Sequence, residues 1–224
     1  MSAKFDAIIF DCDGVLVDSE ILGLDASTAY LQEHGFDWTA ADLVKLFTGF
    51  RDDVFAEKLN AAYYEIHQKN PGEAFFSGLI ETRRARRHLL QTVPGAEKAI
   101  SQIGIKKAIA SSSRTEFLEG KLKRTGLYDL FAPHIYSADK VKHGKPAPDI
   151  FDFAAEKIKT PPAMCLVIED SENGVKAARA AGMDVWGFVG GGHCFPGHDE
   201  RLVAAGATRI IDDFTALTLA LSSP

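Results

Sequence analysis

The stretch that decides the fold is FDAIIFDCDGVLVDSE, at positions 5–20. Its apolar run, Ala7 to Phe10, is too short for a helix and rich in residues that favour strands. The run leads directly into Asp11 and Asp13, and Gly14 then permits a sharp turn. Ligands of open α/β sheets bind at the carboxyl ends of the strands, so we expect both carboxylates at a functional edge. Taken alone, the same residues also fit a simple turn or a helix cap.

Composition describes an ordinary globular protein. The chain has 224 residues, 46% of them hydrophobic, enough for one large domain or a domain with a smaller companion. The net charge of −6 argues against non-specific binding to nucleic acid or to an anionic membrane. Three widely spaced cysteines predict neither a disulfide framework nor a zinc site. Because no signal peptide or transmembrane run is recognisable, we expect a cytoplasmic protein.

Two patterns divide the chain. After a helix expected over residues 20–34, which Ser19 is predicted to cap, helical spacing recurs through residues 39–87. From residue 93 onward helices alternate with short apolar strands at 107–111, 134–138, 165–168, 184–189 and 208–211. This alternation predicts an α/β fold, a Rossmann-like core with a mainly parallel sheet flanked by helices. We assign residues 1–16 and 91–224 to that core, and 17–90 to an inserted all-helical domain.

Four polar clusters follow predicted strands, or lie in a loop just after one. Each has an ordinary explanation: serines cap helices, a lysine is usually solvated, and acidic pairs favour helix N-termini. Four such clusters at one sheet edge are much harder to attribute to chance. The clusters are Asp11 with Asp13, Ser111-Ser112-Ser113, Gly144-Lys145-Pro146-Ala147-Pro148-Asp149, and Glu169-Asp170-Ser171.

The residue types of these clusters indicate chemistry on an oxyanion. Four carboxylates without histidine or cysteine form an all-oxygen set that favours Mg²⁺; they are Asp11, Asp13, Glu169 and Asp170. Lys145 and Ser111 are then explained as donors to a tetrahedral anion such as phosphate. Two unit charges about 4 Å apart repel by roughly 4 kcal/mol at an effective dielectric near 20, so the cations matter. One of two neighbouring carboxylates can act as nucleophile and the other as general acid and base.

The segments FDCDGVLVDSE, ASSS, GKPAPDIF and VIEDSENGVKAARAAGM together resemble, in order and spacing, the four motifs of the haloacid dehalogenase superfamily. The resemblance is to its β-phosphoglucomutase-like branch, which carries a helical cap after the first motif. It implies that Asp11 is the nucleophile and Asp13 the general acid and base, with the Asp13 carbonyl also on the metal. It further implies that Ser111 and Lys145 hold the phosphoryl group. Glu169 and Asp170 would complete the Mg²⁺ site.

The same resemblance implies a phosphatase acting through an aspartyl-phosphate, or alternatively a sugar phosphomutase. Dehalogenating members lack the acid at the position of Asp13, and a halide needs no proton. The mutases carry a cap histidine where this chain has Gly23, which favours water as the acceptor. His34, His67 and His88 keep the mutase open as an alternative. A phosphorylatable signalling domain is a further alternative, although such domains are half this length and lack a helical insert.

Substrate recognition is expected in the cap and around the phosphate site. We predict contacts from Gly49, Phe50, Arg51 and Ser112. An additional hypothesis gives one of the arginines at 83, 84, 86 and 87 a contact with the leaving group, the others being a solvated helix face. His193, Cys194 and His198 could also suggest a metal site, but no further ligand pattern accompanies them, so we do not expect one there. The expected partner is a small phosphorylated metabolite, such as a sugar phosphate, with no nucleic acid and no membrane, and a monomer is plausible.

Overall fold

The computed structural model describes residues 5–47 and 52–222. Its centre is a six-stranded sheet in the order β3-β2-β1-β4-β5-β6, with every neighbouring pair parallel. β1 lies in the middle, and its Phe10 pairs with Ile109 on one side and Ile168 on the other. The α/β fold class predicted from the sequence is confirmed. The strands are β1 (Ala7–Phe10), β2 (Lys106–Ser111), β3 (Ile135–Ser137), β4 (Cys165–Glu169), β5 (Asp184–Phe188) and β6 (Arg209–Ile211).

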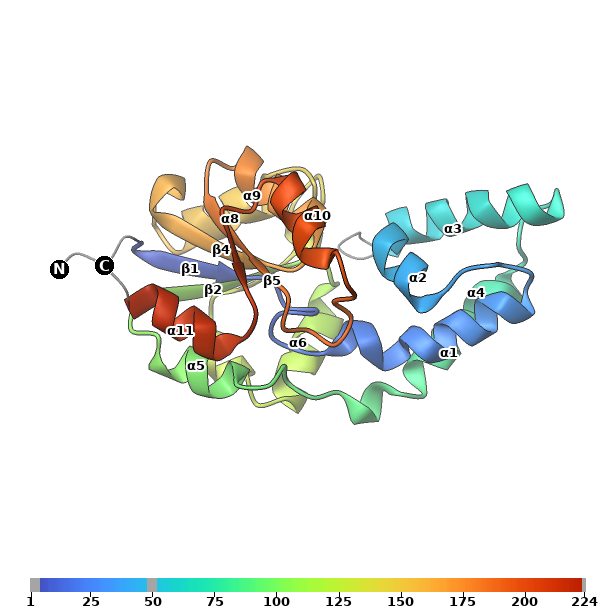
Figure 1. Cartoon of the computed structure of the whole chain (residues 1–224), viewed down its shortest axis with the longest axis horizontal. Helices are drawn as coiled ribbons and strands as arrows, with labels where there is room; N and C mark the ends of the chain where they lie inside the picture. The colour runs from blue at the N-terminus through green and yellow to red at the C-terminus, as the bar shows by residue number, and fades with distance from the viewer. Residues whose placement is uncertain (1–4, 48–51, 223–224) are drawn as a thin grey trace.

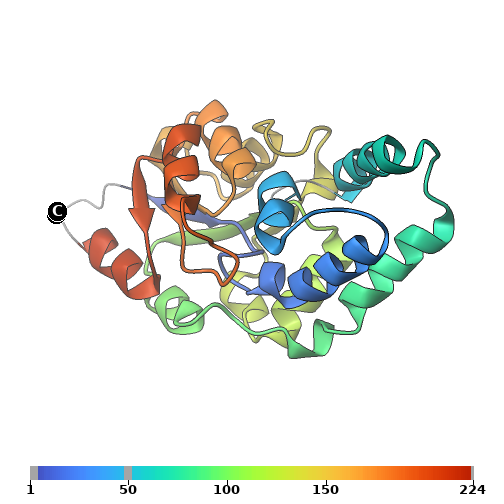
Figure 2. The same cartoon turned by 45° about the vertical axis from the view of Figure 1, so that its right-hand side comes forward.

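Helices cover both faces of this sheet, as Figures 1 and 2 show. One face packs against α5 (Ala96–Gln102), α6 (Thr115–Arg124), α7 (Tyr128–Phe131) and α11 (Phe214–Ser222). The other packs against α8 (Asp149–Lys157), α9 (Glu172–Ala180) and α10 (His198–Ala205). Side chains alternate along β1, so Ile8 and Phe10 enter the first apolar cluster while Ala7 and Ile9 enter the second. The central strand is therefore buried on both faces, and only its carboxyl end remains for chemistry.

Four helices form a separate layer beyond the carboxyl ends of the strands (Figure 1): α1 (Ser19–Glu33), α2 (Ala40–Phe47), α3 (Asp52–His67) and α4 (Glu73–Arg84). They have an apolar cluster of their own, in which the ring of Phe75 contacts those of Tyr30, Phe36 and Tyr63. The predicted domain limits at residues 17 and 90 stay a prediction. We call these four helices the cap.

The two chain segments that connect the cap to the core lie side by side. Val17 forms an antiparallel bridge with Thr92, and the Asp18 amide donates to the Gln91 carbonyl at 3.0 Å. The cap thus leaves the sheet and returns to it at one place. The returning segment contains the 3₁₀ turn η1 (Arg87–Leu89) just before it reaches the core. Two further 3₁₀ turns lie within the core: η2 (Ala138–Lys140) follows β3, and η3 (Pro162–Met164) leads into β4.

Local predictions were wrong at three places. Ser19 does not cap α1. Asp18 occupies the cap position, but its carboxylate accepts from the Gly192 amide and not from the helix, and the Ser19 hydroxyl donates to Asp13. Two short helices, α7 and α10, were not predicted, because each follows a glycine that reads as a loop.

Cys12, Cys165 and Cys194 are free. Within the part of the chain that the structure describes, no helix combines the length and the apolarity that crossing a bilayer requires.

Candidate active site

Three carboxylates meet where β1 and β4 end. Asp11 directly follows β1, Glu169 is the last residue of β4, and Asp170 comes next. Because Phe10 is in register with Ile168, the two strand ends are at the same level. Oxygen atoms of the three side chains all lie within 4.8 Å of one another, and all three residues are buried. Residues about 160 positions apart in the chain are thus brought together by parallel strand pairing.

Lys145 enters this acidic cluster from the loop before α8. Its Nζ lies 2.5 Å from Asp11 Oδ1 and 2.7 Å from Glu169 Oε2, and its side chain is 1% exposed. Burial lowers the pKa of Lys145, but the two carboxylates outweigh burial and raise it above its ordinary value. The pKa of Asp11 is raised well above its usual range, first by burial and then by Glu169, which Lys145 offsets only in part. One lysine therefore does not neutralise three buried carboxylates.

The cluster fits a small divalent cation. An added positive charge would relieve the remaining repulsion, and carboxylate oxygens are the ligands that Mg²⁺ takes. Glycines make room around the carboxylates: a Cβ on Gly14 would lie 2.0 Å from Asp170 Oδ2, and one on Gly174 would lie 2.0 Å from the carboxyl carbon of Glu169. Gly14 also has a φ of +83°, which a side chain would strain. Asp11, Glu169 and Asp170 are thus the side chains able to hold the ion.

Asp13 lies outside this cluster, although the sequence places it only two residues from Asp11. Its carboxylate accepts from the hydroxyl of Ser113 at 2.8 Å, from Ser19, and from the ammonium group of Lys121, with which it forms an ion pair. Burial raises the pKa of Asp13, but Lys121 and these hydrogen bonds outweigh it and hold the pKa below its usual value. The side chain of Asp13 therefore rests as a carboxylate with hydrogen-bond partners of its own, outside the group of the other three.

The serine loop after β2 is held firmly. Ser111 is buried, and its hydroxyl accepts from the Ser113 amide at 3.1 Å. The Ser137 hydroxyl donates to the Ser113 carbonyl at 2.7 Å. Ser112 lies half-buried between them. The loop reaches Asp13 through Ser113, a residue that the sequence did not single out within its triplet.

Sequence reasoning also missed Lys121 and underestimated two histidines. Lys121 is one of several cations on α6, and nothing in its spacing distinguishes it. His193 is fully buried with its Nε2 2.7 Å from Asp170 Oδ2. His198 Nε2 lies 2.6 Å from the Asp170 carbonyl, and its Nδ1 lies 2.9 Å from Arg201 Nη2.

The tautomer of His198 follows from these contacts. Burial lowers its pKa below the ordinary value, so the ring is neutral at neutral pH. Nε2–H then donates to the carbonyl of Asp170, and Nδ1 accepts from Arg201. Ligand-capable atoms of His193, Cys194 and His198 also lie within 4.8 Å of one another. The contacts of both histidines with Asp170 give them a supporting role at the acidic cluster.

Other expected substrate contacts have different outcomes. Gly49, Phe50 and Arg51 lie outside the described residues. The guanidinium of Arg83 stands 4.9 Å from the ring centre of Phe55 and its Nε donates to Ser27, so Arg83 packs the cap together. Arg84 pairs with Glu81 on the surface.

The histidines that kept the mutase open belong to the cap interior or its border. His67 Nε2 lies 2.8 Å from the carbonyl of His34, and the ring of His34 stacks on Tyr30 with centroids 4.3 Å apart. Both rings are therefore used in packing the cap helices. His88 lies in the exposed turn η1.

Comparisons with known proteins find relatives that are similar over most of the chain. The protein YhcW of Bacillus subtilis is 34% identical over 210 residues, which cover 88% of this chain and 90% of YhcW. The phosphorylated carbohydrates phosphatase of Thermotoga maritima is 32% identical, covering 92% of this chain and 94% of its own. A solved haloacid dehalogenase-like protein of Agrobacterium tumefaciens superposes with a TM-score of 0.85 at 33% identity, covering 97% and 98% of the two chains.

The family description that matches the sequence spans both the cap and the strands that carry the acidic cluster. It is that of a haloacid dehalogenase-like hydrolase, and it matches residues 5–182. The structural neighbour and the sequence relatives extend the similarity over nearly the full chain. The chain therefore belongs to the haloacid dehalogenase-like hydrolases.

Proposed function

We propose that this hydrolase is a Mg²⁺-dependent phosphatase that removes phosphate from a small phosphorylated metabolite, most simply a sugar phosphate. The observation that carries the proposal is the buried group of Asp11, Glu169 and Asp170 around Lys145. The activity named for the Thermotoga maritima relative supports the substrate class.

Asp11 is the proposed nucleophile. One of its oxygens attacks the phosphorus atom, the bond from phosphorus to the leaving oxygen breaks, and an aspartyl-phosphate forms. A bound Mg²⁺ supplies positive charge that offsets the repulsion between this carboxylate and the phosphoryl oxygens. Glu169 and Asp170, with the Asp13 carbonyl, would complete the set of ligands. Lys145 adds a fixed positive charge, and Ser111 with the amides of its loop would donate to the phosphoryl oxygens.

Asp13 is the proposed general acid and base. It gives a proton to the leaving oxygen in the first step and takes one from the attacking water in the second, when the bond between phosphorus and Asp11 breaks. At rest Lys121 holds Asp13 as a carboxylate, the form needed in the second step. A dianionic phosphoryl group arriving nearby would raise the pKa of Asp13 and favour the protonated form needed in the first. Closure of the cap would exclude bulk water meanwhile.

The direct test is hydrolysis of p-nitrophenyl phosphate by the purified protein after removal of metal with EDTA. We expect no turnover until Mg²⁺ is restored, and release of inorganic phosphate thereafter. Incubation with β-glucose 1-phosphate separates the mutase, because isomerisation gives glucose 6-phosphate without net phosphate release. Turnover that EDTA leaves unchanged, or its absence at every Mg²⁺ concentration, would contradict the proposal.

A further inference from the structure

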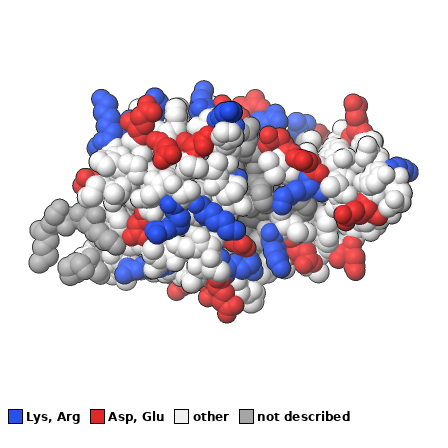
Figure 3. All heavy atoms as spheres, turned by 90° about the horizontal axis from the view of Figure 1, so that it is seen from above, with Lys and Arg blue, Asp and Glu red and all other residues white. Residues whose placement is uncertain are grey.

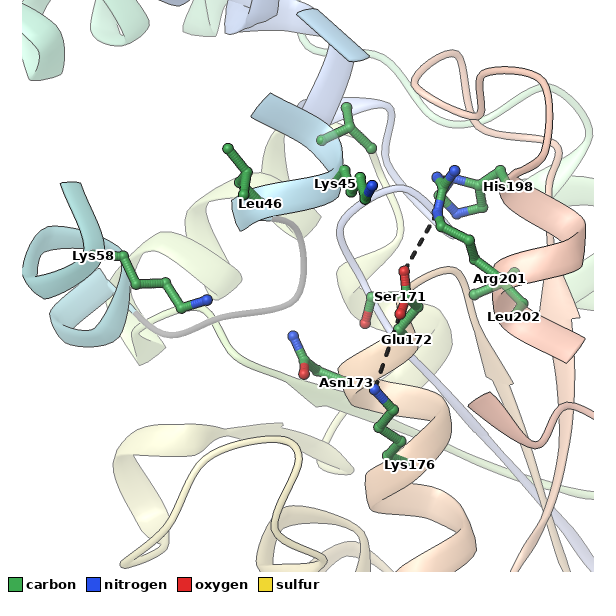
Figure 4. A pocket seen from close by; sticks show the side chains of 11 residues that line it. Lys45, Leu46, Lys58, Ser171, Glu172, Asn173, Lys176, His198, Arg201 and Leu202 are labelled. Atoms are coloured by element: carbon green, nitrogen blue, oxygen red, sulfur yellow. Dashed lines mark hydrogen bonds and ion pairs between the residues drawn. The ribbon is translucent and has the colours of Figure 1, made fainter. Parts of the chain in front are cut away.

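A pocket of about 230 Å³ lies between the cap and the core. Lys45 and Leu46 of α2 and Lys58 of α3 line it from the cap, while Asn173 and Lys176 of α9 and Arg201 of α10 line it from the core. Figure 4 shows these side chains around one space, with the cap and core residues on opposite sides of it. The pocket therefore joins the two parts of the molecule beside the active site.

The lining is predominantly cationic. Its described residues include the cations Lys45, Lys58, Lys176 and Arg201 and one carboxylate, that of Glu172. Glu172 is shared between two of the cations, with Oε1 3.3 Å from Arg201 Nε and Oε2 3.9 Å from Lys176 Nζ. Over the face of the protein drawn in Figure 3, Lys and Arg side chains lie on both the core and the cap, interspersed with acidic ones. A local excess of positive charge thus exists in a chain whose net charge is −6.

The pocket shares residues with the acidic cluster. Ser171 lines it, and the Ser171 hydroxyl donates to Glu169 Oε1 at 2.7 Å. His198 also lines it and donates to the carbonyl of Asp170. Arg201 in turn donates to His198. One wall of the pocket thus begins at Ser171, the residue after Asp170, and two of its side chains contact residues of the acidic cluster.

We propose that this pocket binds a second anionic group on the substrate, a carboxylate or a second phosphate carried by the leaving group. The proposal rests on the phosphatase function above and narrows its substrate class. Lys and Arg recognise the oxygens of both groups, and the N-terminal end of α9 adds favourable electrostatics for an anion. A neutral polyol would gain little from such a lining. Because the cations come from both cap and core, a bound anion bridges the two parts and holds the cap closed.

A matched pair of substrates tests the proposal. Glucose 6-phosphate and 6-phosphogluconate carry the same phosphoester at C6 and differ by the carboxylate at C1. We expect kcat/KM to be at least about tenfold higher for 6-phosphogluconate, a factor typical of one additional ionic contact. Fructose 6-phosphate and fructose 1,6-bisphosphate form a second pair, in which the added group is a phosphate. The pair with the larger ratio identifies which anion the pocket takes.

The double variant Lys45→Gln/Lys58→Gln tests whether the pocket causes the preference, expressed as the ratio of kcat/KM for the doubly anionic substrate to kcat/KM for its singly anionic partner. Both lysines are exposed, so their replacement leaves the apolar clusters intact. We expect the ratio to fall about tenfold, mainly through KM for the doubly anionic substrate. Lys157→Gln is the matched control, since Lys157 is a surface residue of α8 paired with Glu156, and it should keep the wild-type ratio. Higher ionic strength screens charges, so it should lower the kcat/KM ratio of the wild-type protein and change that of the double variant less.

Two failures are distinguishable. If p-nitrophenyl phosphate is hydrolysed but neither pair shows a preference for the second anion, or the double variant keeps the wild-type ratio, the pocket proposal is overturned while the phosphatase stands. If no phosphomonoester is hydrolysed with Mg²⁺ present, the phosphatase proposal fails and this inference fails with it.

Discussion

Asp11 and Asp13 are separated by one residue, yet their surroundings have opposite electrostatic effects. Asp11 sits among Glu169 and Asp170 with one lysine, and its pKa is raised well above the usual range by burial and then by Glu169. Asp13 also suffers from burial, but Lys121 and hydroxyl donors outweigh it and lower the pKa. Asp11 shares the positive charge of Lys145 with Glu169, whereas Asp13 is paired with Lys121.

The difference between Asp11 and Asp13 arises because the chain turns where the strand ends, so that one short segment places two carboxylates in different electrostatic surroundings. β1 ends at Phe10 and the chain turns at Gly14, so the two side chains do not share one direction as alternate residues of a strand would. The turn sends Asp11 toward β4 and Asp13 toward α6. An under-neutralised carboxylate favours a metal cation, whereas a fully paired one favours a proton carrier whose charge state responds to an incoming anion.

The largest effect on turnover is expected from substitution of Asp11. Asp11→Asn keeps the shape but removes the nucleophile, and turnover should fall by at least about 10⁴-fold, as when other covalent nucleophiles are removed. Asp13→Asn should cost about 10²–10⁴-fold, the range of general acid–base catalysis, and should retain phosphate on the protein. Steady-state assays with intact-mass spectrometry measure both. Substantial turnover in Asp11→Asn, or a phosphorylated form of that variant, would refute the assignment.

An intermediate effect is expected on the metal side. His193→Gln removes a buried ring from Asp170 Oδ2, and affinity for Mg²⁺ should weaken by about 10–100-fold, as for other residues that orient metal ligands. The midpoint of Mg²⁺-dependent thermal stabilisation measures it without an activity assay. His88→Gln, on an exposed turn, is the control. Equal Mg²⁺ midpoints for the two variants would show that His193 only fills space.

The smallest effect is expected on the pH dependence of kcat when the counter-charge of Asp13 is removed. Lys121→Met removes the counter-charge, so the pKa of Asp13 should rise. The carboxylate form would then appear only at higher pH, and the acid limb of the pH profile of kcat should move to higher pH. Lys123→Met, which removes a surface pair with Glu119, should leave the limb in place. A limb that does not move, or that moves to lower pH, would mean that Asp13 does not control it.

Much of the core and its acidic cluster could be predicted because parallel strands impose simple geometry. Apolar runs such as that of β4 mark buried strands, and residues just after them, such as Glu169 and Asp170, must gather at one edge. Side chains that reach the site from elsewhere had no such signal. The position of the His193 side chain depends on how the loop after β5 packs against the turn at Gly14. The two segments approach closely, since a Cβ on Gly191 would lie 2.5 Å from the Gly14 carbonyl. The contact of Lys121 with Asp13 depends on where α6 packs against the sheet, which the sequence pattern does not reveal.

Ser19 shows a different reason for failure. A serine before a helical run usually caps it, but here the partly buried carboxylate of Asp13 competes for the same hydroxyl. Local preference predicted the cap, and tertiary proximity to Asp13 decided otherwise. Arg83, one of the four arginines proposed to supply a substrate contact, packs against Phe55 and donates to Ser27 within the cap. The hypothesis that one of the arginines at 83, 84, 86 and 87 contacts the leaving group stays a prediction.

The bridge between Val17 and Thr92 makes the helical unit exchangeable. Because its entry and exit are adjacent, the segment between them could be swapped for one of different size without moving any strand or altering the register of the sheet. Evolution can thus change what such an enzyme accepts by replacing one module, while the reacting groups stay on a framework that the replacement does not touch.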